Sequence, residues 1–209
     1  MKSTKLIIIL IAAIMAFSTL ENYAQQKPNS TVKKETTLKK MYPHVSIAPI
    51  GGAIFPLTRQ LRDEFKPGGL VGLDIGYRIN KEISLQGNFS YVFMSSKLTG
   101  APVGNYLEFS AGPRYFFMHP KLKSALFFEA GVGAYNFRQN SYVNAQDTNG
   151  SAIPQINNTK AGISGGLGVS LSLSEAIDIL VKTNYHNVFT PNGSQGFMTV
   201  NGGLEFRFR

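Results

Sequence analysis

The feature that most constrains this chain is an alternation of apolar and polar residues that recurs in segments of about ten residues. In the clearest segment, Val71, Leu73 and Ile75 alternate with Gly72 and Asp74. A period of two residues is that of a β-strand with one apolar and one polar face. Short polar connections separate several of these segments, so the pattern predicts antiparallel hairpins.

Eight such segments follow one another to the end of the chain. We expect strands over residues 44–55, 71–79, 83–93, 107–117, 125–137, 163–173, 177–186 and 198–208. The connections that begin at Asn80, Met118 and Ser174 are short, whereas those over 57–68, 97–105, 140–160 and 191–196 are longer and mostly polar. Successive strands joined in this way are typical of an all-β, eight-stranded antiparallel up-and-down barrel.

An internal echo supports the hairpins. The stretch from Gly72 to Tyr91 aligns without gaps on the stretch from Gly166 to Tyr185, at a constant offset of 94 residues. The echo predicts two units with the same order of strand, tight turn and strand.

The apolar face predicts contact with lipid. Its aliphatic residues lie in mid-strand, and aromatic residues gather toward the strand ends, as bilayers favour. We expect girdles that include Tyr77, Tyr91, Phe93, Tyr115, Phe117, Tyr185, Phe206 and Phe208, with further members at Phe55, Tyr106, Phe127, Phe128, Phe137, Phe189 and Phe197. A soluble barrel would instead direct its aliphatic side chains inward. The pattern therefore favours a transmembrane β-barrel.

The polar face carries charges of both signs. They form an expected lumen charge network of Asp74, Arg78, Glu108, Arg114, Glu129, Asp178, Lys182, Glu205 and Arg207. Side chains can fill an eight-stranded barrel, so paired charges there predict a closed lumen. A gated ion or proton route is the functional alternative.

The N-terminus predicts export. Lys2 and Lys5 precede an apolar run over residues 6–17, and Ala24 offers a small residue for cleavage. We expect a signal peptide over 1–24, a flexible basic periplasmic lead-in over 25–42, and the barrel over 43–209. The formal charge of +9 is concentrated partly in that lead-in, and no nucleic-acid-binding module follows it.

The sequence shows no pattern typical of a catalytic, metal or cofactor site. It contains no cysteine, and its histidines lack the spacing of metal ligands. We therefore expect no cofactor, no metal site and no catalytic residue.

Membrane barrels place short turns in the periplasm and long loops outside, which puts both termini of eight strands in the periplasm.

Three stretches carry a family resemblance: Gly112-Pro-Arg-Tyr-Phe-Phe, Glu129-Ala-Gly-Val-Gly and the ending Gly203-Leu-Glu-Phe-Arg-Phe. From about residue 43 onward the chain resembles the small outer-membrane β-barrel proteins of the OmpA and OmpX types, although it ends in Arg209 rather than an aromatic residue. The resemblance implies the outer membrane of a Gram-negative-type envelope. It also implies contact with outer-membrane lipid and lipopolysaccharide, and insertion by the barrel-assembly machinery.

We interpret the chain as an outer-membrane barrel with a structural or surface-interaction role, whose surface or envelope protein partner would bind at the loop over 141–159. A narrow porin, a PorT-type secretion-machinery component and a lipid A deacylase-like enzyme are the alternatives. Tyr185-His186-Asn187-Val188 resembles the deacylase motif, but Val188 stands where that family has its serine. The nucleophile is thus missing, and His186 is expected in the lumen or at its rim.

Overall fold

The computed structural model describes residues 42–98, 100–118, 124–143, 152–191 and 193–208. The expected signal peptide, and the lead-in up to residue 41, lie outside the described residues. The barrel strands are β1 (His44–Pro56), β2 (Gly68–Arg78), β3 (Ile83–Met94), β4 (Gly104–Met118), β5 (Ser124–Gln139), β8 (Ile156–Ser172), β9 (Ile177–Thr190) and β10 (Gly193–Phe208).

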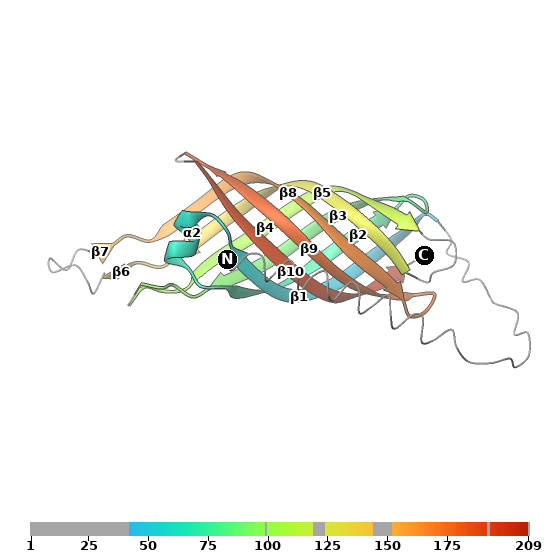
Figure 1. The fold of residues 1–209 in the computed structure, drawn as a ribbon, viewed down its shortest axis with the longest axis horizontal. Helices are drawn as coiled ribbons and strands as arrows, with labels where there is room; N and C mark the ends of the chain where they lie inside the picture. Colours follow the sequence, from blue (N-terminus) through green and yellow to red (C-terminus); the bar gives the residue numbers. More distant parts are fainter. Residues whose placement is uncertain (1–41, 99, 119–123, 144–151, 192, 209) are drawn as a thin grey trace, which may run out of the picture. The chain divides into compact units, whose positions relative to one another are not determined.

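These eight strands form a closed barrel in which neighbours in sequence are neighbours in space (Figure 1). Every adjacent pair is antiparallel, and β1 closes the circle by pairing with both β10 and β2. At the closing seam, Gly51 lies opposite Gly202 and Ala53 opposite Val200. The predicted eight-stranded up-and-down barrel is confirmed.

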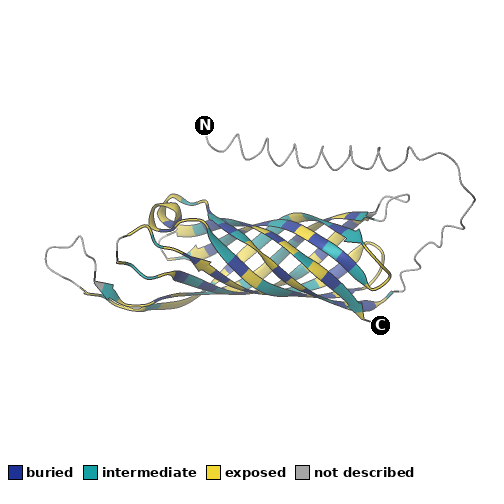
Figure 2. Cartoon of the chain, turned by 90° about the horizontal axis from the view of Figure 1, so that it is seen from below, coloured by how far each residue is buried: buried dark blue, intermediate teal, exposed yellow. Residues whose placement is uncertain are grey.

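The apolar side chains point outward. Val132 and Leu167 are 68% and 62% exposed, whereas Asp74 and Lys182 are each only 3% exposed. The alternation of buried and exposed residues gives the chequered strands of Figure 2. A soluble barrel would show the opposite distribution, so a soluble barrel is excluded and the outer wall is the lipid-facing surface that the sequence predicts.

The two echoed hairpins close in the same way. In the β2–β3 turn, the Asn80 side-chain oxygen accepts hydrogen bonds from the backbone N–H groups of Glu82 and Ile83, each over 2.8 Å. In the β8–β9 turn, Ser174 Oγ accepts from Ala176 and Ile177 over 3.2 and 3.1 Å. Side chains that cap their own turn in this way favour tight hairpins.

The first long connection contains a helix that the sequence analysis missed. In the expected polar stretch over 57–68, α2 spans Arg59–Glu64, and Leu61 together with Phe65 is buried. These two apolar residues are four positions apart, which is the spacing of one helix face. No helix among the described residues is long and apolar enough to cross a bilayer.

The loop-end boundaries of the expected strands were also wrong. β8 begins at Ile156 and β10 at Gly193, inside the connections expected over 140–160 and 191–196. Two short strands, β6 (Tyr142–Val143) and β7 (Ala152–Ile153), pair beyond β5 and β8. Backbone pairing continues past the lipid-facing belt, where both faces of the hairpin are polar and the alternation of hydrophobicity ends.

Candidate functional site

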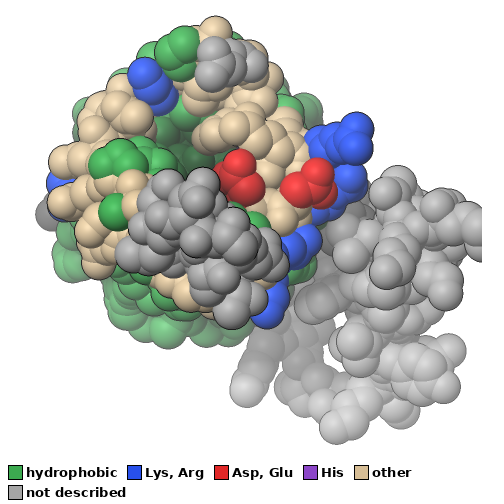
Figure 3. Space-filling model, turned by 90° about the vertical axis from the view of Figure 1, so that its left-hand side faces the viewer, with side chains coloured by type: hydrophobic (Ala, Val, Ile, Leu, Met, Phe, Trp, Pro, Cys, Tyr) green, Lys and Arg blue, Asp and Glu red, His purple; other side chains and the backbone are tan. Residues whose placement is uncertain are grey.

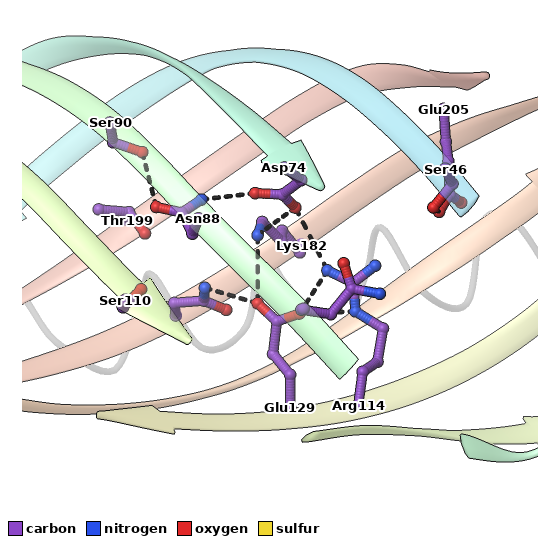
Figure 4. A network of polar contacts seen from close by, with 12 residues as sticks. Ser46, Asp74, Asn88, Ser90, Ser110, Arg114, Glu129, Lys182, Thr199 and Glu205 are labelled. Atoms are coloured by element: carbon purple, nitrogen blue, oxygen red, sulfur yellow. Dashed lines mark hydrogen bonds and ion pairs between the residues drawn. The ribbon is translucent and has the colours of Figure 1, made fainter. Parts of the chain in front are cut away.

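The centre of the lumen holds a cluster of four charged side chains, one each from β2, β4, β5 and β9 (Figure 4). Arg114 Nε donates to Glu129 Oε2 over 2.7 Å, and Arg114 Nη2 lies 3.2 Å from Asp74 Oδ2. Lys182 Nζ lies 2.6 Å from Asp74 Oδ2 and 3.2 Å from Glu129 Oε1. Each cation therefore contacts both carboxylates. We call Asp74, Arg114, Glu129 and Lys182 the ionic cluster.

Two asparagines add hydrogen bonds to the carboxylates of the ionic cluster. Asn88 Nδ2 donates to Asp74 Oδ1, and Asn184 Nδ2 donates to Glu129 Oε1 over 2.7 Å. The Arg114 guanidinium also lies 4.3 Å from the centre of the Phe127 ring. Buried charges are tolerated when they are paired, and each of the four charges has an opposite charge within 3.2 Å. Arg114 Nη1 is buried and has no hydrogen-bond partner among the described residues.

The remaining predicted charges lie elsewhere in the barrel. Arg207 contacts Asp178 at 2.7 Å, and Glu205 accepts a hydrogen bond from Ser46 Oγ over 2.7 Å. Arg78 donates to the backbone carbonyls of Asn80 and Lys81, and its guanidinium lies 3.3 Å from the centre of the Phe116 ring. The structure thus divides the expected network into one central cluster, separate contacts toward the turn end, and Glu108.

Glu108 belongs to a further polar group, built around His186. Its Oε1 lies 3.4 Å from His186 Nδ1 and accepts a hydrogen bond from Ser110 Oγ over 2.9 Å. The Tyr135 hydroxyl lies 3.1 Å from the same Nδ1, and Thr199 Oγ1 lies 3.2 Å from Nε2. His186 is 2% exposed and points into the lumen, so it does not face lipid.

Apolar clusters lie toward both ends of the lumen. At the loop end, Leu61 and Phe65 join a buried cluster made of Ile54, Leu70, Val92, Met94, Tyr106, Tyr135, Val188 and Phe197. A second cluster comprises Ala48, Ile50, Phe116, Ala125, Phe127 and Leu180. The lumen is therefore layered, with an apolar plug formed partly by α2 at the loop end.

Three expected girdle residues belong to these clusters instead, and a fourth packs against one of them. Tyr106, Phe127 and Phe197 are each no more than 1% exposed, and Phe137 packs against the loop-end cluster. The expectation was wrong because it followed distance along the strand and ignored parity: Tyr106 shares the inward parity of Glu108, and Phe127 that of Glu129. The Tyr106 hydroxyl donates to Gln195 Oε1 over 2.7 Å.

The eight principal girdle residues all lie on the outer wall. Tyr77, Tyr91, Phe93, Tyr115, Phe117, Tyr185 and Phe208 are exposed, and Phe206 is partly exposed. Tyr115 and Phe117 pack edge to face, with their ring centroids 4.9 Å apart. The loop end faces the viewer in Figure 3, with Lys and Arg mostly around its periphery and Asp and Glu nearer its middle, whereas apolar side chains cover the wall behind it.

A small cavity borders the ionic cluster. It has a volume of about 30 Å³ and is lined by side chains that include Gln86, Asn88, Ser110, Ser164 and Asn184. A polar cavity of this size holds a few water molecules at most. Among the described residues, no group of three or more His, Cys, Asp or Glu side chains is arranged to hold a metal ion.

Comparison with known proteins gives one family match and several structural ones. Residues 9–208 match the outer membrane protein beta-barrel domain. Neisserial surface protein A (NspA) superposes with a TM-score of 0.58 at 16% identity, covering 79% of this chain and 97% of that one. The N-terminal barrel domain of Pseudomonas aeruginosa OprF gives 0.51 at 17% identity, covering 79% and 98%. OprG from Pseudomonas aeruginosa gives 0.54 at 12%, covering 80% and 97%.

At these identities the structural matches establish the fold alone. No protein with a curated description matches the sequence.

Proposed function

The chain belongs to the family of outer-membrane β-barrel domain proteins, and on this premise we propose that it is a closed, non-catalytic barrel that holds a recognition arm at the cell surface. The arm is the part of the β5–β8 hairpin that extends beyond the lipid-facing belt, together with β6 and β7. In this proposal the long loops lie outside and both termini lie in the periplasm.

The layering of the lumen, with the ionic cluster at its centre and the apolar plug at the loop end, is the observation that carries the closed lumen. A conducting barrel needs a continuous polar path, but here four charges from four strands meet across the lumen centre. The apolar plug lies between them and the loop end. These layers favour a structural barrel over a narrow porin.

The position of His186 argues against the deacylase-like alternative. The deacylase-like alternative needs a histidine and a serine that face the lipid, whereas His186 is buried in the lumen and Val188, two residues later, stands in the place of the serine. We therefore propose recognition rather than catalysis. A surface or envelope protein partner binds at 141–159, of which residues 144–151 lie outside the described part.

The outer wall defines the lipid partners in this proposal. The girdle residues, such as Tyr91 and Tyr115, lie at the headgroup level of phospholipid and lipopolysaccharide, because amphipathic rings favour that level. The last strand, β10, is the segment that the barrel-assembly machinery recognises.

The absence of native cysteine makes the topology directly testable. In intact cells, a membrane-impermeant maleimide should label the loop-end variants Arg59→Cys and Gln155→Cys. The turn-end variants Glu82→Cys and Glu175→Cys should react only after the envelope is permeabilised. Labelling of the turn-end pair alone in intact cells would reverse the proposed orientation.

Planar bilayer recordings test the closed lumen. The purified barrel should give no discrete conductance steps, and a neutralised Asp74→Asn, Lys182→Met variant should give none either, because the apolar plug remains. Regular conductance steps from the wild-type protein would favour the porin.

A further inference from the structure

Within the arm, the first part of β8 has a partner strand on one edge only. β8 pairs with β5 from Leu171, opposite Ser124, to Ile156, opposite Gln139. Its pairing with β9, in contrast, begins at Gly162, opposite Val188. Figure 1 shows β8 diverging there from the tip of β9 and β10. Among the described residues, no strand pairs with the other edge of Ile156–Ala161, which we call the free edge.

The free edge presents backbone hydrogen-bonding groups. Along a β-strand, successive residues direct their N–H and C=O groups to opposite sides, so every second residue of the free edge directs them away from β5. Such a row of unpaired donors and acceptors is a template for another strand.

The side chains beside the free edge hold the arm in an extended form. Asn136 Nδ2 donates to both Asn157 Oδ1 and Thr159 Oγ1, over 2.9 and 2.8 Å. Arg138 Nε donates to Asn136 Oδ1 over 2.6 Å. This ladder ties β5 to β8 on the outer face, so a partner strand would meet a preorganised edge rather than a coil.

We propose that the free edge binds an extended acidic segment of a partner protein by antiparallel strand addition. The inference deepens the proposed function and rests on it, because it names the site and the partner chemistry of the arm. Arg138 and Lys160 are the charged residues of the arm within 135–143 and 152–161, and these described stretches contain no Asp or Glu.

The pairing of β5 with β8 specifies which face of the bound partner strand should carry its acidic side chains. Lys160 lies opposite Tyr135 and shares its inward-facing side, whereas Asn157 and Thr159 lie on the outer side. A bound strand continues the same alternation. Acidic residues at every second position would therefore face Lys160, and hydroxyl or amide side chains would extend the outer ladder.

A second copy of the chain fits the free edge less well. Antiparallel pairing of Ile156–Ala161 with itself would place Lys160 of each copy opposite Asn157 of the other, and so near the Arg138 that lies beside that Asn157. Like charges on paired strands are destabilising, and edge lysines are a common means of preventing self-association.

The test uses the full protein in lipid nanodiscs and a fluorescent hexapeptide of alternating Thr and Glu. Fluorescence anisotropy should show saturable binding. Two isomers of the peptide, N-methylated either at the Thr or at the Glu residues, separate strand addition from simple charge attraction, because only one edge of the bound peptide faces β8. One isomer should bind like the parent and the other at least about tenfold more weakly, through loss of backbone hydrogen bonds.

A charge-reversal variant tests the partner chemistry. Lys160→Glu should lose affinity for the Thr–Glu peptide and gain affinity for its Thr–Lys counterpart, whereas the control variant Lys81→Glu, in the β2–β3 turn, should leave both unchanged. Unshifted heat-modifiable migration in SDS gels verifies that each variant is folded. Equal binding of both N-methylated isomers, binding that ignores Lys160→Glu, or formation of a dimer in place of peptide binding would overturn the proposal.

These readouts do not depend on which side of the membrane the arm occupies. Failure of the cysteine-labelling experiment would refute the topology in the proposed function, whereas failure of peptide binding would refute the free edge as a docking site.

Discussion

Arg114 of β4 and Glu129 of β5 lie directly opposite each other in the antiparallel ladder, and their side chains are joined by a hydrogen bond from Nε to Oε2 of 2.7 Å. The same Arg114 also reaches Asp74 of β2 across the lumen. One residue thus links a neighbouring strand to a distant one, and it does so where all three side chains are buried.

Arg114→Met should destabilise the barrel by about 3–5 kcal/mol, because it leaves Asp74 and Glu129 buried with Lys182 as the one remaining cation of the cluster. Equilibrium unfolding in urea, followed by heat-modifiable gel migration in lipid vesicles, measures the loss. The double variant Arg114→Met, Glu129→Gln removes one charge of each sign and should be clearly more stable than the single one. A double variant that is no better would show that charge balance does not govern this site.

Val132→Arg should weaken the folded state by about 2–4 kcal/mol, the cost of an arginine at the bilayer midplane. Val132 is the most exposed large apolar residue of the described barrel and lies near the middle of β5, opposite Ile163. Gln155→Arg, beyond the belt, is the control and should have little effect. The measurement is unfolding in lipid vesicles; equal losses for both variants would contradict the lipid-facing assignment.

Phe65→Ala should cost about 3–5 kcal/mol, because it removes a buried ring from the apolar plug. The Phe65 ring packs edge to face on Phe137, with centroids 5.9 Å apart. Arg59→Ala is the control: Arg59 begins α2, the helix that Phe65 follows, its side chain is 90% exposed, and the change should alter stability by less than about 0.5 kcal/mol. If thermal unfolding of Phe65→Ala matched the wild type, α2 would not be part of the plug.

Asn80→Ala should lose about 1 kcal/mol, because the backbone N–H groups of Glu82 and Ile83 lose their shared acceptor. Asn80→Asp keeps a side-chain oxygen in place and should retain most of the stability. Ser174→Ala, with longer hydrogen bonds in the equivalent turn, should lose less. Urea midpoints at constant unfolding slope give the comparison, and an unchanged midpoint for Asn80→Ala would show that the cap is dispensable.

The sequence predicted the barrel because its alternation reflects two different surroundings, lipid outside and a polar lumen inside. Leu73, Leu167 and Val200 point outward, and Asp74, Lys182 and Asn201 point inward. The echo of 94 residues likewise predicted two equivalent hairpins, and the structure adds that the aligned residues Asn80 and Ser174 both cap their turns. Where the two faces of a strand differ in polarity, the period of two residues is enough to predict the strand and the side that each residue faces.

The pattern was weaker where that contrast fades. β8 reaches Ile156 through residues that are polar on both faces, and Tyr106 and Phe197 occupy inward positions despite their place near strand ends. The contacts between side chains within the lumen could not be derived either. Alternation shows whether a residue faces inward or outward, but not where along the barrel axis its side chain lies. Asn88, Asn184 and Thr199 were therefore missed as partners. The spacing of Leu61 and Phe65 was the available signal for α2.

The ionic cluster has a consequence for how the strands find their alignment. A slip of one residue turns an apolar face inward and is penalised by the lipid, but a slip of two residues preserves the alternation. It would nevertheless move Asp74, Arg114, Glu129 or Lys182 about 7 Å along its strand, away from its counter-charges. Hydrophobic burial alone does not penalise a shift by an even number of residues. The four buried charges do penalise it, so they select one register of the strands, and therefore one stagger around the barrel, over the alternatives two residues away.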